Sequence, residues 1–560
     1  MWLYVVACYL FAVVSYTVSE QTESRVVRID SGPVRGYKDP NEDIFVYYGI
    51  PYAKAPSGPD RFKAPLPSPI WSETLEAVDT KIICPQVPVS IPGLDSTTKV
   101  MQEDCLIANV FVPNTDENNL PVVVYVHGGG FIIGYGNSIK PKKLATTKKI
   151  IVVTFNYRLA AHGFLCLGTE EVPGNAGIKD QVALLRWVKK NIASFGGNSD
   201  DVTISGNSAG STSVDLLMIS KMAKGLFSKV IPESGANLSP YSVQVDPIQN
   251  AKEYAKLLQY DGEDDIHNLQ DFYKSISYEL LQSGNVVHRT DSDFLMTPCV
   301  ERDIGEERFL EDSPVNILKR GDFDKLPMLY GFTNMEGLMR IDVFDSWKNK
   351  MNTKFSDFLP PDLQFKSEKQ KEAVADKIKM FYFGDEDVSD ETVLDYVNYF
   401  TDVLFACPTL RSISLQIRAG NNQIYLYEYS YVDDSTPVVP YTNVRGASHI
   451  AQTISLLDGV NLISSLDERN ISDDLRTMKY IMRDLWGNFI ATGRPESVGV
   501  PVWPPVGDHM SPYMDLKKNP QLGKHLLKER CSLWNEIYEN HYNNPVPPFI
   551  LSPSQKHNEL

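Results

Sequence analysis

The sequence predicts an α/β protein with a large, mostly parallel central sheet flanked by helices. Strand-type apolar runs recur along the 560 residues, at 120–131, 149–159, 201–210, 325–337 and 422–431. Helix-type segments lie between them, as in 178–197, where the apolar positions include Val182, Leu185, Val188 and Ile192. Apolar strands that alternate with amphipathic helices are typical of a parallel sheet covered on both faces. Functional groups of such sheets collect at the carboxyl ends of the strands, where these runs lead into glycines and polar residues.

One large domain is predicted over residues 20–556. Hydrophobic residues make up 42% of the chain, which is ample for a buried core. No Pro/Gly/Ser-rich linker, low-complexity tract or internal repeat divides the sequence. The formal charge of −17 is dispersed along the chain. Such a surface repels phosphate groups, so neither nucleic acid nor an anionic membrane is expected as a partner.

The two ends of the chain predict the secretory pathway. Residues 1–19 are an apolar run followed by small residues, which is typical of a secretory signal peptide. No other stretch approaches the ~20 apolar residues of a membrane helix, so no membrane anchor is expected. Residues 557–560, HNEL, resemble a retrieval tail of the endoplasmic reticulum (ER). We therefore expect the protein in the ER lumen or secreted.

Two N-x-S/T motifs predict glycosylation, at Asn470 and Asn237. Asn470 is the better candidate, because Asn237 follows Ser234 closely enough to be buried. Seven cysteines are present, of which Cys8 lies in the signal peptide. In an oxidising compartment most of the other six should pair, although their spacing does not assign the pairs. No C-x-x-C or H-E-x-x-H motif occurs, so no metal is expected.

The strongest chemical motif is G-N-S-A-G at residues 206–210. A serine hydroxyl becomes a nucleophile when a neighbouring base removes its proton. On a strained strand-to-helix turn, the residues two before and two after the serine must be very small, as Gly206 and Gly210 are. The preceding strand-type run favours such a turn over a flexible Ser/Gly-rich loop. The sequence therefore predicts Ser208 as a nucleophile.

An oxyanion that develops in the reaction needs preorganised backbone donors. The motif HGGG at residues 127–130 supplies them, since Gly129 and Gly130 have no Cβ and their N–H groups can approach a substrate closely. The N–H of Ala209 would complete this oxyanion hole. A phosphate-binding loop is disfavoured because no G-K-[S/T] follows. We expect His127 to position the loop, because the base of this architecture comes after the serine in the chain.

The same order, serine then acid then histidine, selects the other two catalytic candidates. His449 lies in RGASHIA, a loop of small residues beyond an apolar strand. The other histidines after Ser208 lie in polar or near-terminal segments. Glu336 follows a strand directly and precedes a glycine, although an isolated glutamate in a loop is more often simply solvated.

Together these motifs resemble one family. GIPYAKAP, EDCL, HGGGF, NYRL, GNAGIKDQVALLRWV, GNSAG, ESG, MEG and GASH are similar to the type-B carboxylesterases, and the chain resembles the secreted esterases of insects. The resemblance runs from about Val26 to about Tyr538. It implies the α/β-hydrolase fold and hydrolysis of carboxyl esters through an acyl-enzyme intermediate, with no cofactor and a small-molecule ester as the partner.

The resemblance also implies roles for individual residues. Ser208, Glu336 and His449 would be nucleophile, acid and base, with Gly129, Gly130 and Ala209 as the oxyanion hole. Ser234 and Asn207 would lie just behind them. Cys84 would pair with Cys105, and Cys407 with Cys531. Cys166 and Cys299 match no pair of the family, and their state is left open, with buried free thiols as one interpretation. Salt bridges are implied between Arg61 and Glu103 and between Arg158 and Asp180.

Three narrower interpretations concern the function. Some relatives are adhesion proteins without catalysis, but these typically lose the serine or the histidine, and all three positions are filled here. A cholinesterase is disfavoured, because the segment between Cys84 and Cys105 holds no aromatic residue to bind a cation. Juvenile hormone esterases remain an alternative, although they usually have Gln before the serine. Asn207 stands where many relatives have Glu, so neutral, apolar esters are the expected substrates.

Overall fold

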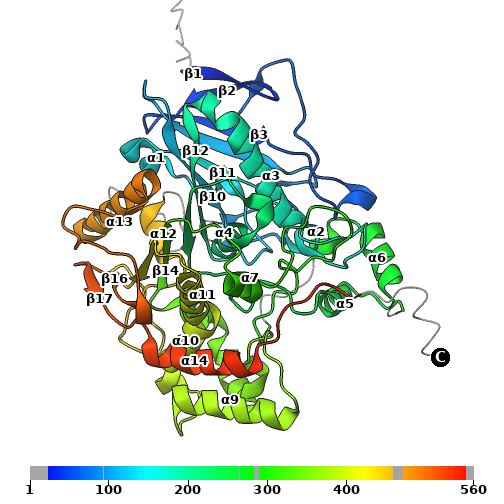
Figure 1. The fold of residues 1–560 in the computed structure, drawn as a ribbon, viewed down its shortest axis with the longest axis vertical. Coiled ribbons are helices and arrows are strands. Elements are labelled where there is room, and N and C mark those ends of the chain that lie inside the picture. Colours follow the sequence, from blue (N-terminus) through cyan, green and yellow to red (C-terminus); the bar gives the residue numbers. More distant parts are fainter. Residues whose placement is uncertain (1–22, 92–93, 264, 283–288, 458–470, 550–560) are drawn as a thin grey trace, which may run out of the picture.

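The computed structural model describes residues 23–549, apart from 92–93, 264, 283–288 and 458–470. Within these residues a 13-stranded sheet forms the centre of the molecule (Figure 1). Its strand order is β1 (Ser24–Ile29), β2 (Gly32–Lys38), β3 (Ile44–Pro51), β9 (Ile107–Pro113), β11 (Ile151–Phe155), β10 (Leu120–Val126), β12 (Gly197–Asn207), β13 (Lys229–Glu233), β14 (Met328–Thr333), β15 (Ile424–Tyr429), β16 (Tyr513–Leu516) and β17 (Gln521–Gly523), with β4 (Leu75–Glu76) beside β2.

The centre of the sheet is parallel and its margins are antiparallel. Every neighbouring pair from β11 to β16 is parallel. The pairs β1–β2, β2–β3, β3–β9, β9–β11 and β16–β17 are antiparallel. The predicted α/β class is confirmed, and all five predicted strands are present as β10, β11, β12, β14 and β15. The sequence analysis did not identify the antiparallel margins: β1 and β2 alternate between buried and more exposed residues, and the apolar runs of β3 and β9 were not selected although most of their residues are buried.

Helices cover both faces of the sheet (Figure 1). Alternate side chains of one strand enter two separate cores: Val122 and Val124 of β10 belong to the larger core, whereas Val123 and Tyr125 belong to the smaller one. The helices are α1 (Lys142–Lys148), α2 (Ala160–Phe164), α3 (Ala176–Asn191), α4 (Ala209–Ile219), α5 (Pro247–Leu257), α6 (Ile266–Ser275), α7 (Pro314–Arg320), α8 (Phe344–Thr353), α9 (Glu368–Phe383), α10 (Val393–Thr401), α11 (Cys407–Arg418), α12 (Ala451–Leu456), α13 (Asp473–Thr492) and α14 (Lys528–His541).

Three disulfides link distant parts of the chain. Cys84 pairs with Cys105 and Cys407 pairs with Cys531, as the family resemblance implies. Cys166 and Cys299, whose state the sequence leaves open, form the third disulfide and are not free thiols. This disulfide packs directly against Gly174. A Cβ at that position would lie 2.6 Å from the sulfur of Cys166, so a residue larger than glycine would clash with the disulfide. Neither cysteine spacing nor the family resemblance assigned this pair, which is separated by 133 residues.

Both implied salt bridges are present and largely buried. Arg158 binds Asp180 through two side-chain nitrogens, at 2.6 and 2.8 Å. Arg61 lies 3.0 Å from Glu103. The guanidinium of Arg158 also donates to the main-chain carbonyls of Arg61 and Lys63, so the two bridges brace the same region. Through Arg158 they join the segment around residues 61–63 to α3.

Several expectations concern the ends and the modifications of the chain. Residues 1–19, Asn470 and residues 557–560 lie outside the described residues. Asn237 is 1% exposed, and its amide bonds the Ser412 hydroxyl and the Asp215 carbonyl. A glycan cannot be attached to such a buried amide, so the prediction for Asn237 is wrong. In the part of the chain that the structure describes, no helix combines the length and apolarity that a bilayer crossing requires. The same part contains no cluster of His, Cys, Asp and Glu suited to a metal ion.

Candidate active site

Ser208 lies on a sharp turn between the end of β12 at Asn207 and the start of α4 at Ala209. Its backbone has φ 59° and ψ −124°, a conformation that costs a non-glycine residue energy. A Cβ at Gly206 would lie 2.4 Å from the carbonyl oxygen of Gly210, and one at Gly210 would lie 2.1 Å from that of Val126. The turn therefore requires glycine at both positions, which is the physical reason for the motif.

Glu336 and His449 come together from segments 113 residues apart. The Nδ1 atom of His449 lies 2.5 Å from Oε2 of Glu336, whose side chain is fully buried. The other carboxylate oxygen, Oε1, accepts hydrogen bonds from the N–H of Thr333 at 2.7 Å and from the Ser234 hydroxyl at 2.5 Å. Glu336 is thus not a solvated loop residue. Its contacts orient the imidazole and leave the opposite ring edge free to face the neighbouring cavity.

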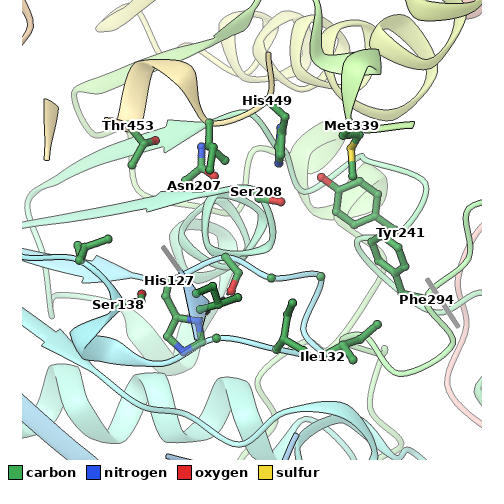
Figure 2. A pocket seen from close by; sticks show the side chains of 18 of the residues that line it. His127, Ile132, Ser138, Asn207, Ser208, Tyr241, Phe294, Met339, His449 and Thr453 are labelled. Carbon is green, nitrogen blue, oxygen red and sulfur yellow. Dashed lines mark hydrogen bonds between the residues drawn. The ribbon is translucent and has the colours of Figure 1, made fainter. Parts of the chain in front are cut away.

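Ser208 and His449 both line one cavity of about 350 Å³. Figure 2 shows the imidazole of His449 pointing toward Ser208, with Asn207 and Thr453 on one side and Met339, Tyr241 and Phe294 on the other. The remaining walls are mostly aliphatic or aromatic. No Asp, Glu, Lys or Arg is among the described residues that line the cavity. A mostly apolar cavity with a few polar groups is typical of a small-molecule site.

The glycine loop after β10 forms a further wall of the cavity. Gly129 has φ 111° and Gly130 has φ 63°, conformations that glycine adopts without strain. The Gln86 side chain braces the loop, donating to the carbonyl of Gly134 at 2.9 Å and accepting from its N–H at 2.8 Å. Gly129 and Gly130 line the cavity beside Ser208. Ala209 is the first residue of α4, where backbone N–H groups have no partner within the helix.

His127 supports this loop. Its Nδ1 lies 2.8 Å from the carbonyl of Gly128, and its ring stacks on Tyr157 at 4.4 Å. Burial lowers the pKa of His127 to about 4, so the ring is neutral at physiological pH. The hydroxyl of Tyr157 donates to the carbonyl of His127 at 2.9 Å. These contacts agree with the expectation that His127 positions the loop.

Sequence reasoning missed one acidic residue beside the cavity, Glu233. It is the last residue of β13 and fully buried, and it accepts hydrogen bonds from Thr453 at 2.9 Å and from the indole of Trp486 at 2.6 Å. Burial raises the pKa of Glu233 to about 7. The signals in the sequence were the acidic residue at the end of the short apolar run KVIPE and the family motif ESG, in which only Ser234 was given a role. Asn207 contacts the same residue, since its amide donates to the Glu233 carbonyl at 3.3 Å.

Comparisons with known proteins agree with this geometry. The chain is 30% identical over 551 residues to pyrethroid hydrolase Ces2a of Mus musculus, covering 96% of this chain and 95% of that protein. It is 32% identical over 512 residues to juvenile hormone esterase of Heliothis virescens, covering 87% and 89%. The crystal structure of juvenile hormone esterase from Manduca sexta with OTFP covalently attached matches with a TM-score of 0.82 and 29% identity, over 92% of this chain and 100% of that chain.

A family model also matches most of the chain. A model of the carboxylesterase family aligns with residues 23–534, which include the turn at Ser208, the glycine loop, Glu336 and His449. The neighbours of known structure are α/β-hydrolase esterases, and this chain has the large central sheet flanked by helices of that fold. The chain therefore belongs to the carboxylesterase family and is an enzyme of that family with the α/β-hydrolase fold.

Proposed function

We propose that this carboxylesterase cleaves neutral, apolar carboxyl esters through an acyl-enzyme intermediate on Ser208. One observation carries the proposal: Ser208 and His449, whose imidazole is bound to the buried Glu336, line the same apolar cavity. A base next to a strained serine, held by a third group, is the arrangement that activates a hydroxyl nucleophile. Our proposal gives the roles of nucleophile, base and orienting acid to Ser208, His449 and Glu336.

The reaction follows from these roles. The free nitrogen of His449 removes the proton of Ser208 as the serine oxygen attacks the ester carbonyl carbon. The carbonyl oxygen becomes an oxyanion that accepts hydrogen bonds from the N–H groups of Gly129, Gly130 and Ala209. His449 then gives its proton to the leaving alcohol, and the acyl group stays on Ser208. A water molecule, deprotonated by His449, repeats the attack and releases the carboxylic acid.

The proposed substrate class rests on the charge of the cavity. Its described lining carries no Asp, Glu, Lys or Arg side chain, so a charged substrate would lose hydration without gaining an ion pair there. A narrower candidate is a juvenile-hormone-type esterase, which the two relatives of that name favour. Those esterases usually have glutamine before the serine, whereas this chain has Asn207. This difference favours the broader class of neutral, apolar esters.

A fluorophosphonate probe tests the proposal directly. We expect the probe to form one covalent adduct, on the peptide that contains Ser208, with loss of ester hydrolysis. Ser208→Ala should abolish both labelling and hydrolysis. Ser138→Ala is the matched control, because Ser138 also lines the cavity but its hydroxyl donates to the Tyr135 carbonyl. Labelling of another residue, or of none, would refute the proposal.

We also propose that the protein enters the secretory pathway and folds there as a single domain over residues 20–556. The oxidising lumen suits a chain with three disulfides. Removing residues 557–560 tests the retrieval tail. The truncated protein should appear in the culture medium, whereas the full chain should stay in the cells. Equal secretion of both would show that HNEL is not a retrieval signal in this protein.

A further inference from the structure

The carboxyl end of β13 joins the segments that carry Ser208, Glu336 and His449. The main-chain carbonyl of Glu233 accepts a hydrogen bond from the N–H of Ser208 at 2.9 Å. The next residue, Ser234, donates from its hydroxyl to Glu336 at 2.5 Å. The turn that presents the serine and the carboxylate that binds the histidine are therefore both attached to this one strand end.

The side chains at this strand end also hold the helix that follows His449. Helix α12 begins at Ala451, two residues after His449. Thr453 donates its hydroxyl hydrogen to Glu233 at 2.9 Å, and the amide of Gln452 donates to Ser234 at 2.6 Å. Two consecutive residues of the strand end thus bind two consecutive residues of α12. His449 lies at the start of the segment that these bonds anchor.

The side chains that form hydrogen bonds with Glu233 are neutral. Helices α12 and α13 present the Thr453 hydroxyl and the Trp486 indole, and β12 presents the amide of Asn207, which bonds the main chain. Two titratable neighbours are the phenols of Tyr125 on β10 and Tyr427 on β15, and burial raises the pKa of each phenol well above its ordinary value. A third is Glu336, which lies on the other side of Ser234. Among the described residues, no Lys, Arg or His forms an ion pair with Glu233. A buried carboxyl without a counter-charge is costly to ionise, which raises its pKa to about 7.

We propose that Glu233 is a positioning residue for ester hydrolysis: its carboxylate accepts hydrogen bonds from Thr453 and Trp486 and so fixes α12 and the orientation of His449 toward Ser208. The inference rests on the roles proposed above for Ser208 and His449. When Glu233 is protonated, its own hydrogen needs an acceptor, and the Thr453 hydroxyl must rotate to provide one. The link to α12 then changes from a charge-assisted hydrogen bond to a neutral one, which is weaker.

Steady-state kinetics of Glu233→Gln between pH 6 and pH 8.5 test the inference. At pH 8 we expect kcat to fall about tenfold and KM to stay within about twofold, because a misplaced base slows the chemical step more than it weakens binding. At pH 6 the kcat values of the native and variant enzymes should agree within about twofold, because the native carboxyl is then mostly protonated and resembles the amide. A merely structural role for Glu233 would give the same loss at every pH.

Thr453 supplies a second test that keeps the shape of the cavity. Thr453→Val removes the hydroxyl and should reproduce the loss in kcat at pH 8, whereas Thr453→Ser keeps the hydroxyl and should retain native kcat. Native kcat at pH 8 in both Glu233→Gln and Thr453→Val would overturn the inference, as would a pH-independent loss in Glu233→Gln. Failure of the proposed function would give a different result. In that case the native enzyme would carry no fluorophosphonate adduct on Ser208.

Discussion

Asn207, next to the serine, is a neutral residue at a position where the family resemblance implies an acidic one. Its side chain is 3% exposed and lines the cavity, and its amide donates to the main chain of Glu233. The amide keeps a polar group beside Ser208 without a charge. The acidic residues nearby, Glu233 and Glu336, are fully buried and do not line the cavity.

Asn207→Glu should move the acid limb of kcat/KM to higher pH by about one unit. A carboxylate beside His449 favours the protonated imidazole, which cannot act as a base, so a higher pH is needed for activity. Asn207→Gln is the matched control, because it has the same length as glutamate and no charge. The measurement is kcat/KM of a neutral ester from pH 5 to pH 9. An unchanged acid limb in Asn207→Glu would mean that this position does not influence the charge of the site.

At the scale of elements, the β12–turn–α4 unit depends on two close backbone contacts. Gly210→Ala would place a Cβ 2.1 Å from the carbonyl oxygen of Val126, in the strand next to β12. Backbone atoms of a central strand cannot move away cheaply. We expect Gly210→Ala to lose hydrolysis and fluorophosphonate labelling and to lower the free energy of unfolding by at least about 2 kcal/mol.

Gly507→Ala is the control for this change, since its Cβ would meet only the Ser511 carbonyl at an ordinary 3.5 Å. The measurements are denaturant unfolding and the labelling rate of each variant. Native activity in Gly210→Ala would show that the turn tolerates a side chain, contrary to the contact described here.

The disulfide between Cys166 and Cys299 ties the segment after α2 to the segment before α7. Asn175 strengthens this connection, since its side chain accepts from the N–H of Cys299 at 2.9 Å and donates to its carbonyl at 2.8 Å. Phe294, which lines the cavity, lies five residues before Cys299. One wall of the cavity is therefore covalently anchored to the rest of the fold.

Removal of this disulfide should destabilise the protein more than it slows the reaction. In the chain-entropy model, a disulfide across 133 residues stabilises by about 5 kcal/mol. We expect Cys166→Ala/Cys299→Ala to lose stability of this order in denaturant unfolding while kcat stays near the native value. Thiol titration of the denatured native protein should find no free thiol from these two cysteines. Two reactive thiols there would contradict the pairing.

At the scale of the whole molecule, the charge of the surface and the charge of the cavity differ. The chain carries a formal charge of −17, whereas no Asp, Glu, Lys or Arg is among the described residues lining the cavity. The negative surface attracts cations from solution. Salt screens this attraction and reduces its range, the Debye length, to about 3 Å at 1 M. The cavity itself offers a cation no counter-charge, so entry requires it to lose its hydration shell.

A neutral ester should therefore be hydrolysed at least about tenfold more efficiently than a quaternary ammonium ester of the same shape. Added salt should widen this ratio, because it removes the attraction of the surface for the cation and leaves the cost of entering the cavity. The measurement is kcat/KM for the matched pair at low and high ionic strength. Equal efficiencies for the two esters would refute the proposed preference for neutral substrates.

Local patterns in the sequence predicted the parts of this protein that local forces build. The central strands follow from continuous apolar runs, and the turn at Ser208 follows from the glycines that its backbone contacts require. The position of Glu336 and His449 after Ser208 followed from the order of such residues in the fold. Their contact, across 113 residues, is described only by the structure.

Long-range packing decided the rest. The pairing of Cys166 with Cys299, the burial of Asn237 and the antiparallel margins of the sheet depend on which distant segments become neighbours. The same holds for Glu233, whose importance arises because β13 lies between β12 and β14 and reaches α12 and α13 at its end. The sequence by itself determined which residues could perform the chemistry, because strand and turn patterns are local. Tertiary structure alone decided which groups surround and hold them, because those contacts join residues more than one hundred positions apart.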